Sequence, residues 1–189
     1  MKKFLLSAAL IAAATFSLSA QEKGDMAVGG TLGVSGGVES ETSNAQFELS
    51  PQFSYFVIDN LELSAGLKYT LDAVEKNTLN VAMFTVGANY YLPLVKGKLF
   101  YTPGVQFGFG GGSQIVDFGG EKFTGKLPFA FGFSADLGKF EFKALDCLGV
   151  TLNALDFTVL YLTTEAKTSV TNFTAGFNYG MSVGVKYYF

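Results

Sequence analysis

The chain ends in a long stretch that alternates between apolar and small or polar side chains. Every odd position from 173 to 189 is apolar, whereas the even positions, apart from Tyr188, carry side chains such as those of Thr174, Gly180 and Lys186. Successive side chains of a β-strand point to opposite faces, so the pattern predicts a strand with one apolar face and one small polar face. A strand that separates lipid from a crowded polar lumen requires this pattern.

Composition favours a membrane barrel over a soluble β-domain. Charged residues make up 15% of the chain, against about 25% in an ordinary soluble domain. The outer face of a soluble β-sandwich is usually rich in Lys, Glu and Arg, but the second face here carries mostly Gly, Ser, Thr, Asn and Gln. A soluble secreted β-domain remains the structural alternative.

The N-terminus has the pattern of a secretory signal. Lys2 and Lys3 precede an apolar run from Phe4 to Ala14, and small residues then lead to a cleavage site before Gln21. We therefore expect a signal peptide at residues 1–20 and one barrel domain at residues 21–189. The apolar run is shorter than the ~18 residues of a membrane-spanning helix, and no later stretch approaches that length. A mature chain that enters a membrane must then close into a barrel, because only helices and closed barrels satisfy their backbone groups in lipid.

Alternation of this kind recurs along the chain and predicts an all-β, eight-stranded antiparallel up-and-down transmembrane barrel. Bacterial single-chain barrels have even strand numbers, so ten strands is the alternative. Short turns at Ile58–Asn60 and Pro93–Lys98 and longer loops elsewhere predict that both termini are periplasmic. The expected strands are Met26–Ser35, Gln46–Val57, Leu61–Asp72, Leu79–Leu92, Leu99–Phe109, Lys126–Asp136, Val150–Leu162 and Phe173–Phe189, and the expected outer loops are Gly36–Asn44, Ala73–Thr78, Gly110–Glu121 and Thr163–Ser169.

Some segments break the pattern. The apolar positions of the fourth strand change parity, which a β-bulge near Met83 would explain, and the seventh strand changes parity near Leu155. The segment Leu137–Gly149 is ambiguous, since Phe140–Lys143 alternates and fits either a short extra strand or a structured periplasmic turn. Proline cannot donate to a strand ladder, so strand ends or bulges are expected at Pro51, Pro103 and Pro128.

Three runs resemble small outer-membrane β-barrel proteins common in Bacteroidetes, of the OmpX-, OmpW- and OmpA-barrel-like group. They are residues 50–61 (SPQFSYFVIDNL), residues 86–93 (VGANYYLP) and residues 183–189 (VGVKYYF). The resemblance implies the outer membrane of a Gram-negative bacterium, with contacts to membrane lipid and lipopolysaccharide. It also implies that the barrel assembly machinery reads the closing strand at Val183, Val185, Tyr187 and Phe189. The chain departs from the group in the segment Phe140–Gly149 and in having no arginine.

The composition leaves little room for catalysis. The chain has no histidine and one cysteine, Cys147, so a Ser–His nucleophile pair and a His/Cys metal site cannot be assembled. Small outer-membrane enzymes resemble one another in relying on a histidine base. The run Gly110–Gly112 lacks the Lys-Ser/Thr that a phosphate-binding loop needs, so it predicts a flexible loop. We expect no enzyme activity, no cofactor and no nucleic-acid partner.

Six charged residues fall on the polar face of the expected strands. They could form a gate or ion path, but a static network is favoured because an unpaired buried charge is costly and side chains fill an eight-stranded barrel. These residues are Glu48, Glu62, Lys68, Lys126, Asp136 and Lys186.

The sequence thus predicts a non-enzymatic outer-membrane barrel with a structural, surface-contact or adhesion role through its outer loops. One alternative is OmpW-like passage of small hydrophobic molecules, through an aperture or cavity lined by Phe56, Tyr91 or Phe100, or a weak pore. The sequence does not identify a surface partner.

Overall fold

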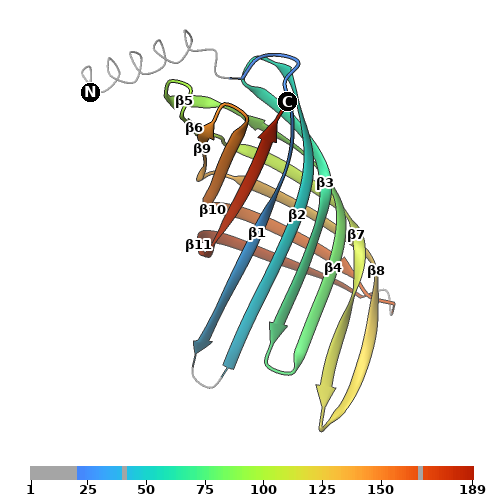
Figure 1. The fold of residues 1–189 in the computed structure, drawn as a ribbon. Helices are drawn as coiled ribbons and strands as arrows, with labels where there is room; N and C mark the ends of the chain where they lie inside the picture. Colours follow the sequence, from blue (N-terminus) through green and yellow to red (C-terminus); the bar gives the residue numbers. More distant parts are fainter. Residues whose placement is uncertain (1–20, 40–41, 166–167) are drawn as a thin grey trace, which may run out of the picture.

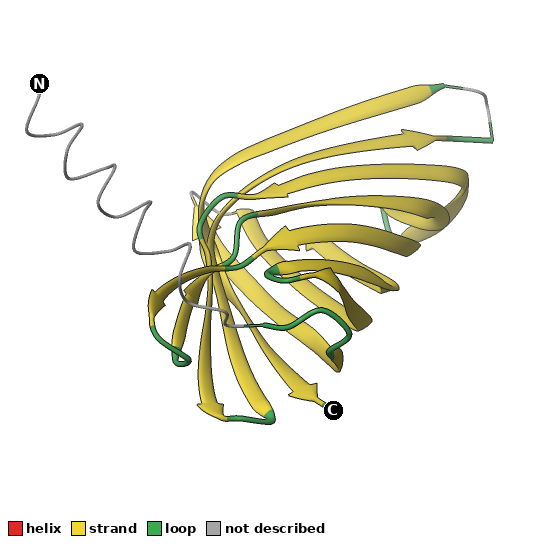
Figure 2. Cartoon of the chain, turned by 90° about the horizontal axis from the view of Figure 1, so that it is seen from above, coloured by secondary structure: helices red, strands yellow, loops and turns green. Residues whose placement is uncertain are grey.

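The computed structural model describes residues 21–39, 42–165 and 168–189; the expected signal peptide lies outside these residues. The described chain consists of strands joined by short turns (Figure 2). Its strands are β1 (Met26–Glu39), β2 (Thr42–Ile58), β3 (Leu61–Val74), β4 (Asn77–Tyr90), β5 (Leu92–Val95), β6 (Leu99–Tyr101), β7 (Gly104–Phe118), β8 (Glu121–Asp136), β9 (Lys139–Leu145), β10 (Leu148–Thr163) and β11 (Ser169–Tyr188). Within the described ranges, no helix is both long and apolar enough to span a membrane.

Three pairs of these labelled strands each form one long strand of the barrel wall that is interrupted by a local break. We call each such wall strand a stave, whether or not it is interrupted. β10 pairs with β9 from Leu148 to Asn153 and with β8 from Asp156 onward, so β8 and β9 form one stave broken at Leu137–Gly138. In the same way β5 continues β4 past Tyr91, and β7 continues β6. The segment Leu137–Gly149 is therefore the end of the sixth stave and its turn, rather than a separate strand.

The staves close into an antiparallel up-and-down barrel. Each stave pairs with its neighbours in sequence, and β11 pairs with both β10 and β1 (Figure 1). The described residues thus form eight staves, which confirms the predicted fold. Residues Gln21 and Phe189 lie at one end of the barrel, where the backbones of Met26 and Phe189 pair. We refer to this as the terminal end and to the opposite end as the loop end.

The outer surface of the barrel is apolar. On β3, Leu63 and Leu67 are exposed on the outside, whereas Glu62 and Ser64 are buried inside. Neighbouring strands align aromatic rings outside the barrel: the ring centroids of Phe107 and Phe133 are 5.1 Å apart, and those of Phe109 and Phe131 are 5.3 Å apart. The alternation of the sequence therefore separates an apolar outer belt from a polar lumen, as in transmembrane barrels.

The loop end consists of protruding hairpins instead of long loops. β7 runs through the expected loop Gly110–Glu121 to Phe118 and turns at Gly119–Gly120, both of which have positive φ. β1 and β2 likewise pair as far as Glu39 and Thr42. The prediction of a flexible loop at Gly110–Gly112 is wrong, because these residues pair with β4 (Figure 1). The strand ladders continue beyond the apolar belt into segments that carry small or polar residues.

The fourth stave has no bulge near Met83, contrary to the sequence-based expectation. The register of β4 is continuous with both β3 and β7. Leu79, Val81 and Met83 therefore point into the lumen, while Phe84 and Val86 point outward. The change of parity in the sequence marks an apolar patch inside the barrel.

A bulge does occur in β8, where proline is tolerated. The register between β7 and β8 shifts at Gly110/Gly112, where the two residues Pro128 and Phe129 of β8 lie opposite the single residue Gly111 of β7. Leu127 is consequently buried inside the barrel and Lys126 is exposed. The predicted parity change near Leu155 is also observed, as a register shift between β10 and β11.

The ring is closed by a short ladder. Among the residues that the structure describes, β1 and β11 pair from Ala27–Tyr188 to Leu32–Val183, which is six residue pairs, all toward the terminal end. On its other side β1 pairs with β2 over fourteen residue pairs. Toward the loop end, the described pairings of β1 are with β2, and those of β11 are with β10.

Candidate functional site

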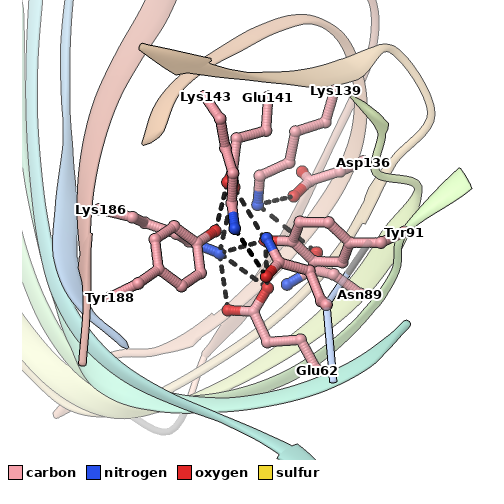
Figure 3. A network of polar contacts seen from close by, with 10 residues as sticks. Glu62, Asn89, Tyr91, Asp136, Lys139, Glu141, Lys143, Lys186 and Tyr188 are labelled. Atoms are coloured by element: carbon pink, nitrogen blue, oxygen red, sulfur yellow. Dashed lines mark hydrogen bonds and ion pairs between the residues drawn. The ribbon is translucent and has the colours of Figure 1, made fainter. Parts of the chain in front are cut away.

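A buried ion pair forms the centre of a polar cluster inside the terminal end of the barrel. The Lys186 ammonium on β11 donates to both carboxylate oxygens of Glu62 on β3, with Nζ–Oε distances of 2.6 and 2.7 Å. Glu62 is 0% exposed and Lys186 is 2% exposed. The two side chains come from separate strands of the wall and meet inside it, together with neighbours from several other strands (Figure 3).

Two tyrosines connect this pair to a second carboxylate. The Tyr91 hydroxyl lies 2.7 Å from Glu62 Oε2 and 2.8 Å from Glu141 Oε2, and it accepts a hydrogen bond from Lys186. A hydroxyl has one proton, so Tyr91 donates to one of these carboxylates at a time. The Tyr188 hydroxyl donates to Glu141 Oε1. Lys186 and Tyr91 thus hold Glu62 directly, and Glu141 and Tyr188 extend the network from Tyr91.

Further lysines complete the charge balance. Lys139 pairs with Asp136 at 3.2 Å, and its ammonium is 3.4 Å from Asn89 Oδ1. The Lys143 ammonium lies 4.3 Å from the centre of the Tyr188 ring. We call this cluster the plug: Glu62, Tyr91, Asp136, Lys139, Glu141, Lys143, Lys186 and Tyr188. Its three carboxylates are matched by three ammonium groups, the condition under which charges are tolerated in a low-dielectric interior.

Aromatic side chains pack against the plug and fill the remaining space. Phe56 and Phe100 are fully buried, and their ring centroids lie 5.1 and 5.9 Å from that of Tyr91. An eight-stranded barrel leaves an interior that side chains can just fill. The terminal end is therefore closed by side chains. Phe56, Tyr91 and Phe100 are part of this closure and do not line an open aperture.

The structure divides the six predicted lumen charges into three groups. Glu62 and Lys186 lie at the centre of the plug, and Asp136 joins it through Lys139. Glu48 and Lys68 form a separate pair at 2.8 Å, nearer the loop end. Lys126 is exposed outside the lumen, because the β8 bulge reverses the parity of its strand. Including Lys126 among the lumen charges is therefore incorrect.

Sequence reasoning missed the other half of the plug. Glu141, Lys139 and Lys143 lie on β9, in the segment whose role the sequence left open. The signal that could have found them is the alternation of Phe140 and Phe142, both exposed, with Glu141, which is 0% exposed. The break at Gly138 obscured it: that alternation belongs to the same stave as β8.

A second feature, the lumen pocket, lies nearer the loop end. It is a cavity of about 220 Å³ with two unlike walls. β2 and β3 contribute the polar side chains of Gln46, Glu48, Lys68, Thr70 and Asp72, while β4 and β10 contribute Leu79, Val81, Met83 and Leu160. A smaller, mostly polar cavity of about 80 Å³ lies between the pocket and the plug, and Glu48, Lys68 and Asp156 line both cavities.

The lumen presents ion pairs, hydrogen bonds and an apolar patch. Within the described ranges, no group of three or more His, Cys, Asp or Glu residues is placed to hold a metal ion. The Cys147 thiol is exposed in the turn between β9 and β10. At the closing strand, Val183, Val185, Tyr187 and Phe189 are all exposed on the outside of the barrel.

No protein-family model matches the chain, and no curated protein matches it. Among solved structures, the chain is similar to neisserial surface protein A (NspA), with 15% identity over 87% of this chain and 96% of that chain and a TM-score of 0.47. It is also similar to the N-terminal β-barrel domain of Pseudomonas aeruginosa OprF (12% identity, 89% and 100% covered, TM-score 0.47) and to Ail of Yersinia pestis (11% identity, 88% and 99% covered, TM-score 0.46). The barrel fold follows from the strand pairing of this chain itself.

Proposed function

We propose that this chain is a non-enzymatic outer-membrane barrel protein of a Gram-negative bacterium that stabilises the envelope and makes surface contacts through its protruding hairpins. The observation that most supports this proposal is the combination of an apolar outer belt with a lumen closed at its terminal end by the plug. Such a belt matches lipid, in which only helices and closed barrels satisfy their backbone groups. A closed terminal end argues against passage through the barrel and leaves the outer face and the hairpins as the surfaces for contact with lipid and other macromolecules.

The β7–β8 hairpin is the main contact surface in this proposal. Residues 121–126 at the start of β8 are all exposed, and the Phe123 side chain is 58% exposed. Among the described residues this segment pairs with β7 alone, since β10 joins β8 from Phe129 onward. The hairpin therefore presents a free strand edge together with Lys122, Lys126 and an exposed aromatic ring. Lipopolysaccharide phosphates and surface proteins are the partners we propose for it.

Two further segments serve biogenesis in this proposal. Residues 1–20 act as the signal peptide that directs the chain to the envelope. The closing strand is recognised by the barrel assembly machinery.

The test of this placement uses the single cysteine. If the terminal end faces the periplasm, a membrane-impermeant maleimide should leave Cys147 unlabelled in intact cells and label it after the outer membrane is broken. In a Cys147→Ser background, Gly120→Cys at the hairpin tip should be labelled in intact cells. Because Gly120 has positive φ, the heat-shifted gel band of a folded barrel must be verified for this variant. Labelling of Cys147 in intact cells would overturn the orientation, and recovery in the soluble fraction would overturn the membrane barrel.

Conductance distinguishes this function from the alternative of a pore. In planar bilayers, the unaltered protein should show little or no steady current, because the aromatic side chains and the plug close the terminal end. The variant Phe56→Ala/Phe100→Ala removes two fully buried rings and should raise the current. The matched control is Phe123→Ala on the hairpin, which leaves the plug intact. A large, stable current in the unaltered protein, unchanged by the double substitution, would favour passage through the lumen.

A further inference from the structure

We propose that the lumen pocket binds an amphipathic organic cation: a protonated amine attached to a compact apolar body. The pocket joins an apolar wall to an acidic wall, and a ligand of this class uses both. The inference does not rest on the surface-contact role, because the pocket lies inside the barrel and its test reads a side chain there.

The apolar wall is built around Met83. Val81 and Met83 from β4, Leu127 and Ala130 from β8 and Leu162 from β10 form a buried cluster, with Leu79 and Leu160 packed against it. Gly108 and Gly132 make room for this cluster: a Cβ atom at either position would lie 3.2 or 3.3 Å from the Met83 sulfur. Methionine is flexible and polarizable, so it can adapt to an apolar ligand of irregular shape.

The acidic wall has more carboxylates than ammonium groups, since Glu48, Asp72 and Asp156 line the pocket together with Lys68. Glu48 is paired with Lys68 and Asp136 with Lys139. Asp72 and Asp156 also line the pocket, and in the described part of the chain neither forms a salt bridge or accepts a hydrogen bond from another side chain. The lysine whose charge acts on Asp156 is Lys68, which is already paired with Glu48. Asp72 lies in register with Leu79, so a carboxylate and the edge of the apolar wall face the same space. This junction is two residue pairs from the β3–β4 turn, near the loop end.

These walls select among ligand classes. A carboxylate that is partly removed from water gains most from a hydrogen-bonding cation, since charge-assisted hydrogen bonds are stronger than neutral ones. A bare metal ion would leave the apolar wall in contact with water, and a neutral hydrocarbon would leave the carboxylates unmatched. An anion would be repelled. Pockets for small molecules commonly combine an apolar lining with a few placed polar groups.

The test uses cyclohexylmethylammonium, a small water-soluble cation, with cyclohexylmethanol and cyclohexanecarboxylate as neutral and anionic counterparts. The chain has four methionines, of which Met83 lines the pocket and Met26 lies on the outer surface. Carbon-13 labelling of the methionine methyl groups in a nanodisc sample gives each residue its own NMR signal, and Met83→Leu assigns the Met83 signal. We expect the cation to shift the Met83 signal saturably and the Met26 signal little. The alcohol should bind about tenfold more weakly, which corresponds to ~1.4 kcal/mol.

Variants show whether the carboxylates are responsible. Asp72→Asn/Asp156→Asn should weaken binding of the cation by tenfold or more and leave binding of the alcohol nearly unchanged. The matched control is Asp146→Asn, an exposed position in the turn at the terminal end, which should bind the cation as the unaltered protein does. Equal binding of all three compounds, no saturable shift at Met83, or undiminished cation binding in the double variant would each overturn the proposal. The heat-shifted gel band verifies that each variant is folded.

Discussion

Replacing Lys186 by methionine should lower the free energy of unfolding by about 3–5 kcal/mol, the cost of removing one partner of a buried ion pair. The substitution keeps a long apolar stem but leaves Glu62 and Glu141, both 0% exposed, without the ammonium between them. Urea titration of the barrel in lipid vesicles, read by the heat-shifted gel band, measures the change. The companion variant Lys186→Met/Glu62→Gln removes both charges of the pair and should recover part of the loss.

The Glu48–Lys68 pair provides the control. Its side chains are 27% and 19% exposed, so Lys68→Met should cost at most about 1 kcal/mol, as for other solvated pairs. If Lys186→Met and Lys68→Met proved equally mild, the plug would not be a dry network, and the closed terminal end on which the proposed function depends would have to be abandoned.

A lysine on the outer belt should be the second most damaging change. Phe131→Lys places a charge where the ring now packs against Phe109, and a lysine facing lipid near the bilayer midplane costs about 2–4 kcal/mol. Phe123→Lys is the matched control, because it makes the same substitution on the hairpin beyond the belt. The same urea titration should show a large loss for Phe131→Lys and little change for Phe123→Lys. Equal losses would mean that Phe131 does not face lipid.

Alternation predicted the staves because a barrel wall separates two unlike environments. Alternate side chains of each strand face one or the other, apolar toward the outside and small or polar toward the lumen. Beyond the belt that contrast disappears, since both faces of a hairpin meet polar surroundings. The ladder of β7 continues through Gly110–Gly112 to Phe118 although the sequence loses its period there. The sequence therefore predicted loops at positions where the apolar belt ends but the strands continue. Backbone hydrogen bonding sets the length of these strands, and the pattern of apolar and polar side chains does not reveal it.

The candidate site was predictable only where the lumen is polar. Glu62 and Lys186 lie on strands of regular parity, and their assignment to the inner face agrees with their burial. The expected bulge near Met83 is absent, because Val81 and Met83 face the lumen in continuous register and form the apolar wall of the lumen pocket. The prediction that Lys126 faces the lumen is wrong for a related reason. The bulge at Pro128 changes which residues face inward, and it is visible in the register of β7 and β8 but not in the sequence.

The short ladder between β1 and β11 also bears on the order in which the barrel forms. These strands are the first and last of the described chain, so joining them closes the longest loop and carries the largest entropic cost of any neighbouring pair. Six residue pairs at the terminal end must offset that cost. We therefore expect this ladder to form last on folding and to separate first on unfolding, with the free edges toward the loop end as the starting point. The two ends of one polypeptide would then set the kinetic lifetime of the whole ring.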